Sequence, residues 1–215
     1  MRLLATTLLL AVIAGGCATT EPYDYTSYRA HMPVSILILP PLDDTVEVDA
    51  TYGYLSTVTR PLAERGYYVF PVAVVDRMLR ENGLPGPAEM HTVSLEKIDE
   101  IFGADAVLYL RITEWGTSYM VLSSSTEVRI EASLVDVATG TELWSGSHYA
   151  VHSSGGGSLV EMAANALVSQ VASSFDDRAR GVARQANQSL FWDRDRGLLL
   201  GAYHPDHGTD TEETP

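Results

Sequence analysis

The first seventeen residues decide which part of this chain can form a folded body. They begin with one positive charge at Arg2, continue as an apolar run over residues 3–13, and end with three small residues directly before Cys17. As a helix, this apolar run would span about 16 Å, roughly half of the hydrocarbon core of a bilayer. The run therefore suits an export signal better than a permanent membrane span, and we expect residues 1–16 to be cleaved off.

Cys17 follows the small residues in the arrangement typical of a lipobox, in which the cysteine thiol accepts a diacylglyceryl group. The alternative is a buried cysteine behind an ordinary signal peptide. We expect lipidation of Cys17, so that acyl chains hold the mature chain on a lipid bilayer at about 0.8 kcal/mol per buried methylene. By resemblance to the sorting of Gram-negative lipoproteins, Ala18 after Cys17 favours the outer membrane.

Composition limits what the rest of the chain can be. Cys17 is the only cysteine, so the fold does not depend on disulfides. Without residues 1–16 the chain is long enough for one domain with a hydrophobic core, and no other apolar stretch is long enough to cross a bilayer. The net charge is −14 and no stripe of Lys and Arg occurs, which argues against nucleic acid as a partner.

Both ends of the mature chain lack helical or strand periodicity. Residues 17–32 are predicted to be a lipidated cysteine followed by a flexible tether, and residues 205–215 to be a disordered acidic tail. A single domain is then expected over residues 33–204. The tether tyrosines have no core to join in this interpretation, so they are candidates for contact with a partner protein; they are Tyr23, Tyr25 and Tyr28.

The first half of the expected domain alternates strands and helices. The order is β-α-β-α-α-β, which is typical of parallel strands joined by helical crossovers. The expected elements are a strand at 34–39, a helix at 50–65 that ends at Gly66, a strand at 67–70, helices at 72–81 and 94–102, and a strand at 106–113.

The second half has a different pattern. Residues 127–134 alternate apolar and polar side chains, as a half-exposed strand does, and a turn at 136–140 leads into a second strand at 143–149. A long helix is expected from a capping box at 158–161 through Ala186. The predicted fold class is α/β with an α+β tendency: a mixed sheet with a parallel part, an antiparallel hairpin and a long C-terminal helix.

Several groups could carry chemistry, but each has a simpler explanation. The Gly-rich segment 153–158 lacks the spacing of a phosphate-binding loop and is expected to be a hinge with a helix cap. His148 and His152 would lie about 13 Å apart along a strand, too far for one metal ion. The acidic pair at 43–44 is expected to form a turn, and the histidines at 204 and 207 lie where the fold gives way to the tail. We predict no catalytic residues, metal or cofactor.

Two further aromatic residues, Trp115 and Tyr119, are candidates for partner contact because aromatic side chains contribute much of the binding energy at interfaces. The alternative for the tryptophans is packing in the core or at the edge of the sheet. Trp144 and Trp192 are open to the same two interpretations.

Several segments resemble a family of uncharacterised proteobacterial lipoproteins typified by a genome-derived meningococcal vaccine antigen. The resemblance covers about residues 25–204, and its most specific piece is 61–71; the other segments are 25–29, 35–41, 104–109, 115–116 and 134–144. It implies a fold similar to the N-terminal domain of TolB and to the periplasmic domains of the curli secretion lipoprotein and of a lipoprotein activator of peptidoglycan synthase. None of these relatives is an enzyme, so the resemblance carries over no catalytic residues.

The leading hypothesis is a non-enzymatic lipoprotein of the outer membrane that docks other envelope proteins, as an accessory in envelope assembly, secretion or surface biogenesis. One alternative is a homo-oligomeric ring or pore subunit, for which residues 119–125 would have to extend as membrane-crossing strands of about 9–11 residues each. Another is a small-ligand binder or hydrolase that uses His148, His152 or Asp43.

Overall fold

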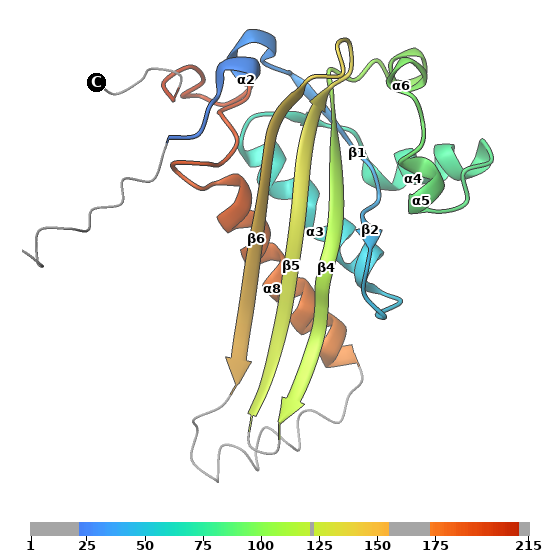
Figure 1. The fold of residues 1–215 in the computed structure, drawn as a ribbon, viewed down its shortest axis with the longest axis vertical. Coiled ribbons are helices and arrows are strands. Elements are labelled where there is room, and N and C mark those ends of the chain that lie inside the picture. The colour runs from blue at the N-terminus through green and yellow to red at the C-terminus, as the bar shows by residue number, and fades with distance from the viewer. Residues whose placement is uncertain (1–21, 121–122, 155–172, 211–215) are drawn as a thin grey trace, which may run out of the picture.

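The computed structural model describes residues 22–120, 123–154 and 173–210. These residues form one six-stranded mixed sheet with the strand order β3-β1-β4-β5-β6, and β2 pairs separately with β4 (Figure 1). The predicted fold class is confirmed, since a parallel part is followed by an antiparallel part and a C-terminal helix. In the described part of the chain, no helix combines the length and the apolar character needed to cross a membrane.

In the parallel part, β1 pairs in parallel with both β3 and β4, and β2 also runs parallel to β4. The helices between these strands occur where the sequence predicts them, and the short elements β2 and α5 are additions. The elements are β1 (Ser35–Ile38), β2 (Leu42–Asp43), α3 (Ala50–Glu64), β3 (Tyr68–Val69), α4 (Val72–Glu81), α5 (Pro87–Met90), α6 (Leu95–Phe102) and β4 (Ala106–Met120).

The antiparallel part consists of β4, β5 (Ser123–Asp136) and β6 (Glu142–Ser154). These strands extend well beyond the stretches that the alternation predicts. A bulge between Ile112 and Glu114 shifts which residues of β4 face the core, and this hides the continuation of the strand from a simple two-residue pattern. The predicted turn is confirmed: the Gly140 N–H donates to Asp136 O at 2.9 Å, and Gly140 has a φ of 72°.

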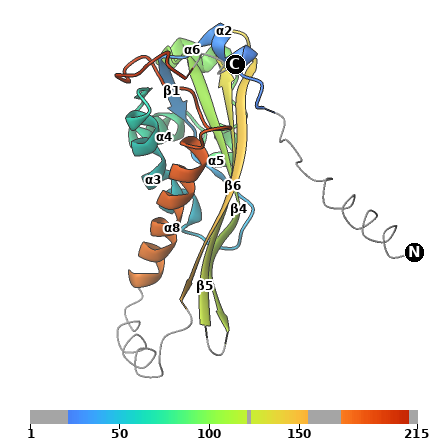
Figure 2. The ribbon, with the colours of Figure 1, turned by 90° about the vertical axis from the view of Figure 1, so that its left-hand side faces the viewer.

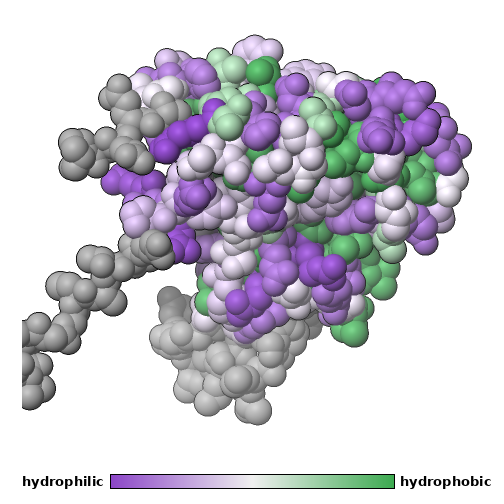
Figure 3. Space-filling view, turned by 45° about the horizontal axis from the view of Figure 1, so that its top comes forward, coloured by the Kyte–Doolittle hydropathy of each residue, from purple (hydrophilic) through white to green (hydrophobic). Residues whose placement is uncertain are grey.

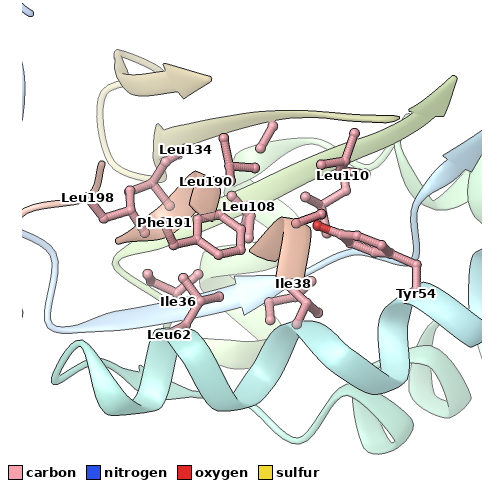
Figure 4. Packing of buried hydrophobic residues seen from close by; sticks show 14 of the residues in the cluster. Ile36, Ile38, Tyr54, Leu62, Leu108, Leu110, Leu134, Leu190, Phe191 and Leu198 are labelled. Carbon is pink, nitrogen blue, oxygen red and sulfur yellow. The ribbon is translucent and has the colours of Figure 1, made fainter. Parts of the chain in front are cut away.

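The larger core lies between the sheet and the helices α3 and α8 (Ser173–Phe191). Figure 4 shows Leu190 and Phe191 of α8 close to Leu134 of β5, while Tyr54 of α3 points toward Leu110. The predicted apolar stripe of the last helix is confirmed at its C-terminal end, where every third or fourth residue is buried; these residues are Ala179, Val182, Ala183, Ala186 and Leu190. The predicted helix start at 158–161 lies outside the described residues.

A smaller core covers the other face of the sheet around β1 and the start of β4, where α4, α5 and α6 pack. Further along β4, β5 and β6, that face carries no described helix, while α8 lies along the opposite face (Figure 2). We call this uncovered surface the open face. Its side chains come from alternate residues of the three strands, so the sheet register places them in rows.

The residues before the first strand are folded, in contrast to the expected tether. Residues 26–31 form helix α2 (Thr26–His31), and the side chain of Tyr28 is completely buried in the larger core. The domain therefore begins before residue 33. We call residues 22–32 the N-terminal clasp.

The expected boundary at the C-terminal end also needs correction. The carboxylate of Asp210 accepts a hydrogen bond from Leu200 N at 2.5 Å, and His207 Nδ1 lies 2.7 Å from Leu200 O. Residues 205–210 are thus folded back on the body, while residues 211–215 lie outside the described residues. We call residues 197–210 the C-terminal strap.

Candidate functional site

Three tyrosine hydroxyls attach the N-terminal clasp to the body. The Tyr23 hydroxyl accepts a hydrogen bond from Ser145 N in β6 at 2.8 Å, and the Tyr25 hydroxyl donates to Gly197 O in the strap at 2.5 Å. Tyr28 and Tyr67 are joined through their hydroxyls at 2.6 Å, and Tyr67 donates to the strap at Leu199 O. The clasp therefore bridges β6 and the C-terminal strap.

These contacts change the interpretation of the tether tyrosines. The premise that they have no core to join is wrong, because Tyr28 belongs to the core and Tyr25 packs against it. Tyr23 is half-buried and keeps part of its ring exposed. Of these three candidates for partner contact, Tyr23 is the one that also lines a depression in the surface.

Burial gives the clasp a pH-dependent contribution to stability. It raises the pKa of Tyr25 to about 12 from an ordinary value of 10.0. A folded-state pKa above the unfolded value means that the neutral phenol is stabilised by folding, so this contribution is complete below pH 10 and is lost as the pH rises toward 12.

We expect Tyr25→Phe to lower the free energy of unfolding at pH 7 by about 1 kcal/mol, because the hydrogen bond to Gly197 O is lost. We also expect the variant to lose less stability than the wild type between pH 9 and pH 11, since one of the titrating phenols is absent. Urea unfolding at several pH values measures both effects. Tyr203→Phe is the control, because Tyr203 is 69% exposed; equal pH profiles for all three proteins would contradict the prediction.

A shallow depression of about 700 Å³ beside Tyr23 is lined by residues of β4, β5 and β6 on the open face, and it continues around β6 to residues 189–196 at the end of α8. The sheet register places two rows of side chains across it; the first is Tyr109, Ser133 and Ser145, and the second is Arg111, Glu131 and Ser147. On the face shown in Figure 3, hydrophobic residues form separate groups among hydrophilic ones. The sequence alternation marks these residues as outward-facing, but only the register of three strands shows that they form one surface.

Several polar groups of this depression already have partners within the protein. The Arg111 guanidinium forms an ion pair with Asp44 at 2.9 Å, and the Ser133 hydroxyl donates to Glu142 at 2.7 Å. His91 Nε2 lies 2.9 Å from Pro40 O, and burial lowers the pKa of the His91 imidazole. This arrangement suits a fixed recognition surface.

The residues considered for catalysis or metal binding are not brought together. Asp43 is the last residue of β2 and not part of the predicted turn, and its carboxylate accepts a hydrogen bond from Thr45 N at 2.8 Å just after the strand ends. His148 is half-buried, with its pKa lowered by burial, while His152 is exposed further along β6. Within the described ranges, no group of three His, Cys, Asp or Glu side chains could hold a metal ion, and no serine hydroxyl pairs with an imidazole.

Of the remaining predicted site residues, the structure describes Trp115 and Tyr119 but not Cys17. Trp115 is half-buried and packs against the larger core, on the α8 side of the sheet, so part of its ring serves packing. Tyr119 lies in β4, where it pairs with Ser124 of β5. Cys17 lies outside the described residues, as does most of the Gly-rich segment, and lipidation of Cys17 stays a prediction.

The proteins to which this chain is similar include two close relatives and more distant solved structures. A lipoprotein of Neisseria meningitidis serogroup B, named "Putative lipoprotein NMB1124/NMB1162", is 43% identical over 184 residues, which are 85% of this chain and 86% of the relative. The crystal structure of lipoprotein GNA1162 from Neisseria meningitidis is 46% identical, has a TM-score of 0.55, and matches 66% of this chain and 99% of that one. The C-terminal domain of LpoB from Salmonella enterica is 20% identical with a TM-score of 0.38, and covers 66% of this chain and 92% of that domain.

A family model agrees with these relationships. The model described as "Putative lipoprotein GNA1162-like" matches residues 23–203, which include nearly all of the clasp, the whole described sheet and half of the strap. The chain therefore belongs to the GNA1162-like lipoprotein family.

Proposed function

We propose that this protein is a non-enzymatic lipoprotein, held on the outer membrane by acylated Cys17, that docks other envelope proteins as an accessory in envelope assembly, secretion or surface biogenesis. Membership of a lipoprotein family supports the anchor. The open face supports docking, because it is a broad surface whose two arginines, Arg111 and Arg129, are fixed in position by ion pairs within the protein.

The attachment of Tyr23 to Ser145 is the observation that carries the proposal. Cys17 precedes Tyr23 by six residues, which can span at most about 20 Å. A lipidated Cys17 would therefore keep the clasp end of the body near the bilayer. The open face, which begins at the same level of the sheet, would remain accessible to other proteins.

The same geometry weighs against a pore in the membrane that holds the anchor. The clasp is at the level of Tyr109, and the end of β4 at Met120 lies about 37 Å further along the strand. The strands are longer than the sequence predicted, so their length alone does not exclude the pore alternative. With the clasp closed and a tether of about 20 Å, the strands could extend only about 17 Å into the anchoring bilayer, which is roughly half of its hydrocarbon core.

The test uses the full chain expressed in Gram-negative cells, with variants at the anchor. We expect the wild type to incorporate labelled palmitate and to sediment with outer membranes, and Cys17→Ser to lose both properties. Ala18→Asp is the matched control, since it keeps the cysteine and should move the labelled protein to the inner membrane. A Cys17→Ser chain that still carries palmitate and still sediments with membranes would overturn the anchor.

Crosslinking in intact cells tests the docking role. We expect the wild type to recover specific envelope proteins, and we expect the recovery to fall for Cys17→Ser because the body is no longer confined to the membrane. Light scattering of the purified lipoprotein then determines its oligomeric state. Recovery of no envelope protein above background, together with a closed ring of copies, would replace the docking role with the ring alternative.

A further inference from the structure

β6 is an edge strand whose outer hydrogen-bonding groups can be assigned from one contact. Ser145 N donates to Tyr23, which lies outside the sheet, so this N–H points away from β5. The pairing of β6 with β5 is unbroken from Ser145 to Ser154, and the orientation of successive N–H groups alternates along a strand. The N–H and C=O groups of residues 147, 149, 151 and 153 therefore also point away from β5.

We call Ser147–Ser153 the β6 edge. Among the described residues, none outside β5 forms a backbone hydrogen bond with it. Natural sheets usually protect such edges with Lys, Pro, a bulge or a covering segment. The β6 edge has no Lys, Pro or bulge, and it carries two exposed apolar side chains, Tyr149 at 39% and Val151 at 46% exposure.

The outer edge of β4 is protected in the same region. A bulge interrupts the strand between Ile112 and Glu114, and Gly116 adopts a φ of 126°. The side chain of Glu47 lies against this glycine, 3.5 Å from the position of a Cβ atom. Where β4 extends beyond β2, its free side is therefore protected in a way that the β6 edge is not, and pairing of β6 with β4 of a neighbouring copy would meet this protection.

Charge near the β6 edge favours a basic partner. Glu131 pairs across from Ser147, and Glu127 pairs across from Val151, on the open face. The cation between them, Arg129, is already paired with Glu114 at 2.9 Å and lies over the Tyr149 ring at 4.4 Å. The whole chain carries a net charge of −14, which opposes the approach of a second copy and favours a cationic segment.

We propose that the β6 edge binds an extended segment of another protein as an added strand, and that this segment carries Lys or Arg two positions on either side of an apolar residue. The main chain would bond to the four outward-facing residues, the apolar side chain would contact Tyr149 and Val151, and the cations would approach Glu127 and Glu131. Tyr23 ends the site, because its hydroxyl occupies the next outward N–H at Ser145. This inference rests on the proposed docking function and names the surface and the class of partner.

The binding test uses the purified full-length lipoprotein in detergent micelles and a fluorescein-labelled peptide, Thr-Lys-Thr-Val-Thr-Lys-Thr. We expect saturable binding by fluorescence anisotropy. The same peptide N-methylated at alternate residues keeps its charge but loses donors on one edge, so it should bind about tenfold more weakly or less. A peptide with Glu in place of both Lys should also bind more weakly.

Val151→Pro tests the edge itself. Proline at residue 151 removes an outward N–H that the β5–β6 ladder does not use, so we expect a loss of affinity of about tenfold or more with the sheet retained. Val46→Pro is the matched control, because Val46 is 93% exposed in a loop away from β6. Circular dichroism checks folding, and Val151→Lys, which keeps the N–H but repels the cationic peptide, gives a second variant at the same position.

Equal binding by Val151→Pro and the wild type, or equal binding of the methylated and unmethylated peptides, would overturn the inference. Dimerisation that Val151→Pro abolishes would also overturn it, since the edge would then belong to a second copy. If the peptide does not bind but crosslinking in cells still recovers envelope proteins, then docking uses another surface, and the proposed function stands while the inference about the β6 edge is overturned. If Cys17→Ser keeps its palmitate and its membrane association, the anchor fails independently of the peptide result.

Discussion

Alanine in place of Gly66 is expected to lower the free energy of unfolding by about 3 kcal/mol. Gly66 has a φ of 90°, a conformation that strains any residue with a Cβ atom. A Cβ at this position would also lie 2.3 Å from His204 N, which is backbone and cannot turn away as a side chain can. The strap would have to move, and the hydrogen bonds Gly201 N to Arg65 O and Tyr203 N to Gly66 O would be lost.

Gly83→Ala separates the two causes. Gly83 has nearly the same φ, 88°, but no atom lies within 4 Å of its Cβ position. This variant should show only the conformational strain, about 1–2 kcal/mol. Urea unfolding of both variants measures the difference, which reports the contact between Gly66 and the strap. Equal destabilisation would mean that the strap adjusts without loss.

Gly66 also illustrates what the sequence can predict. The ends of α3 and α6 follow from glycines at 66 and 103, which adopt positive φ, and from Ser94, whose side chain accepts a hydrogen bond from Lys97 N. These signals act over three or four residues. The positions of these helices could therefore be predicted from the local sequence, without knowledge of the rest of the fold.

The clasp and the strap depend on contacts between residues far apart in the sequence. Tyr25 and Gly197 are separated by 172 positions, and Tyr67 and Leu199 by 132. Helix α2 has six residues with no side-chain cap, so its stability comes from burial of Tyr28 against the body. A segment of this kind looks like a polar linker until its tertiary partner is known.

The candidate site could be predicted only in part for a related reason. The alternation identifies Arg111 and Glu131 as outward-facing, but their neighbours on β6 follow only from the strand register. Before the bulge at Ile112, the even-numbered residues of β4 face the core, and after it the odd-numbered residues do. Trp115 therefore pairs with Val128 on the core side of the sheet. The β6 edge is likewise a property of strand order, and the sequence of β6 alone does not reveal it.

A second large effect is expected where α3 meets α8. The buried Asn187 side chain accepts a hydrogen bond from the Tyr54 hydroxyl and donates one to Thr57 Oγ1 at 2.9 Å. Burial raises the pKa of Tyr54, so the hydroxyl stays a neutral donor. Asn187→Leu keeps the number and branching of the side-chain heavy atoms but leaves this buried hydroxyl without an acceptor, and we expect it to lower the free energy of unfolding by about 3 kcal/mol.

Removing the orphaned donor should restore much of that loss. Thr57 keeps a partner in the variant, because its hydroxyl also donates to Tyr54 O at 2.7 Å. Adding Tyr54→Phe to Asn187→Leu replaces both members of the pair by apolar groups, which is close to neutral when the shape is kept. The double variant should therefore be more stable than Asn187→Leu alone, with a coupling energy of about 1–2 kcal/mol in urea unfolding of all four proteins. Simple additivity of the two single effects would show that the Tyr54 hydroxyl finds another partner, and that Asn187 does not join the two helices in the way the hydrogen bonds indicate.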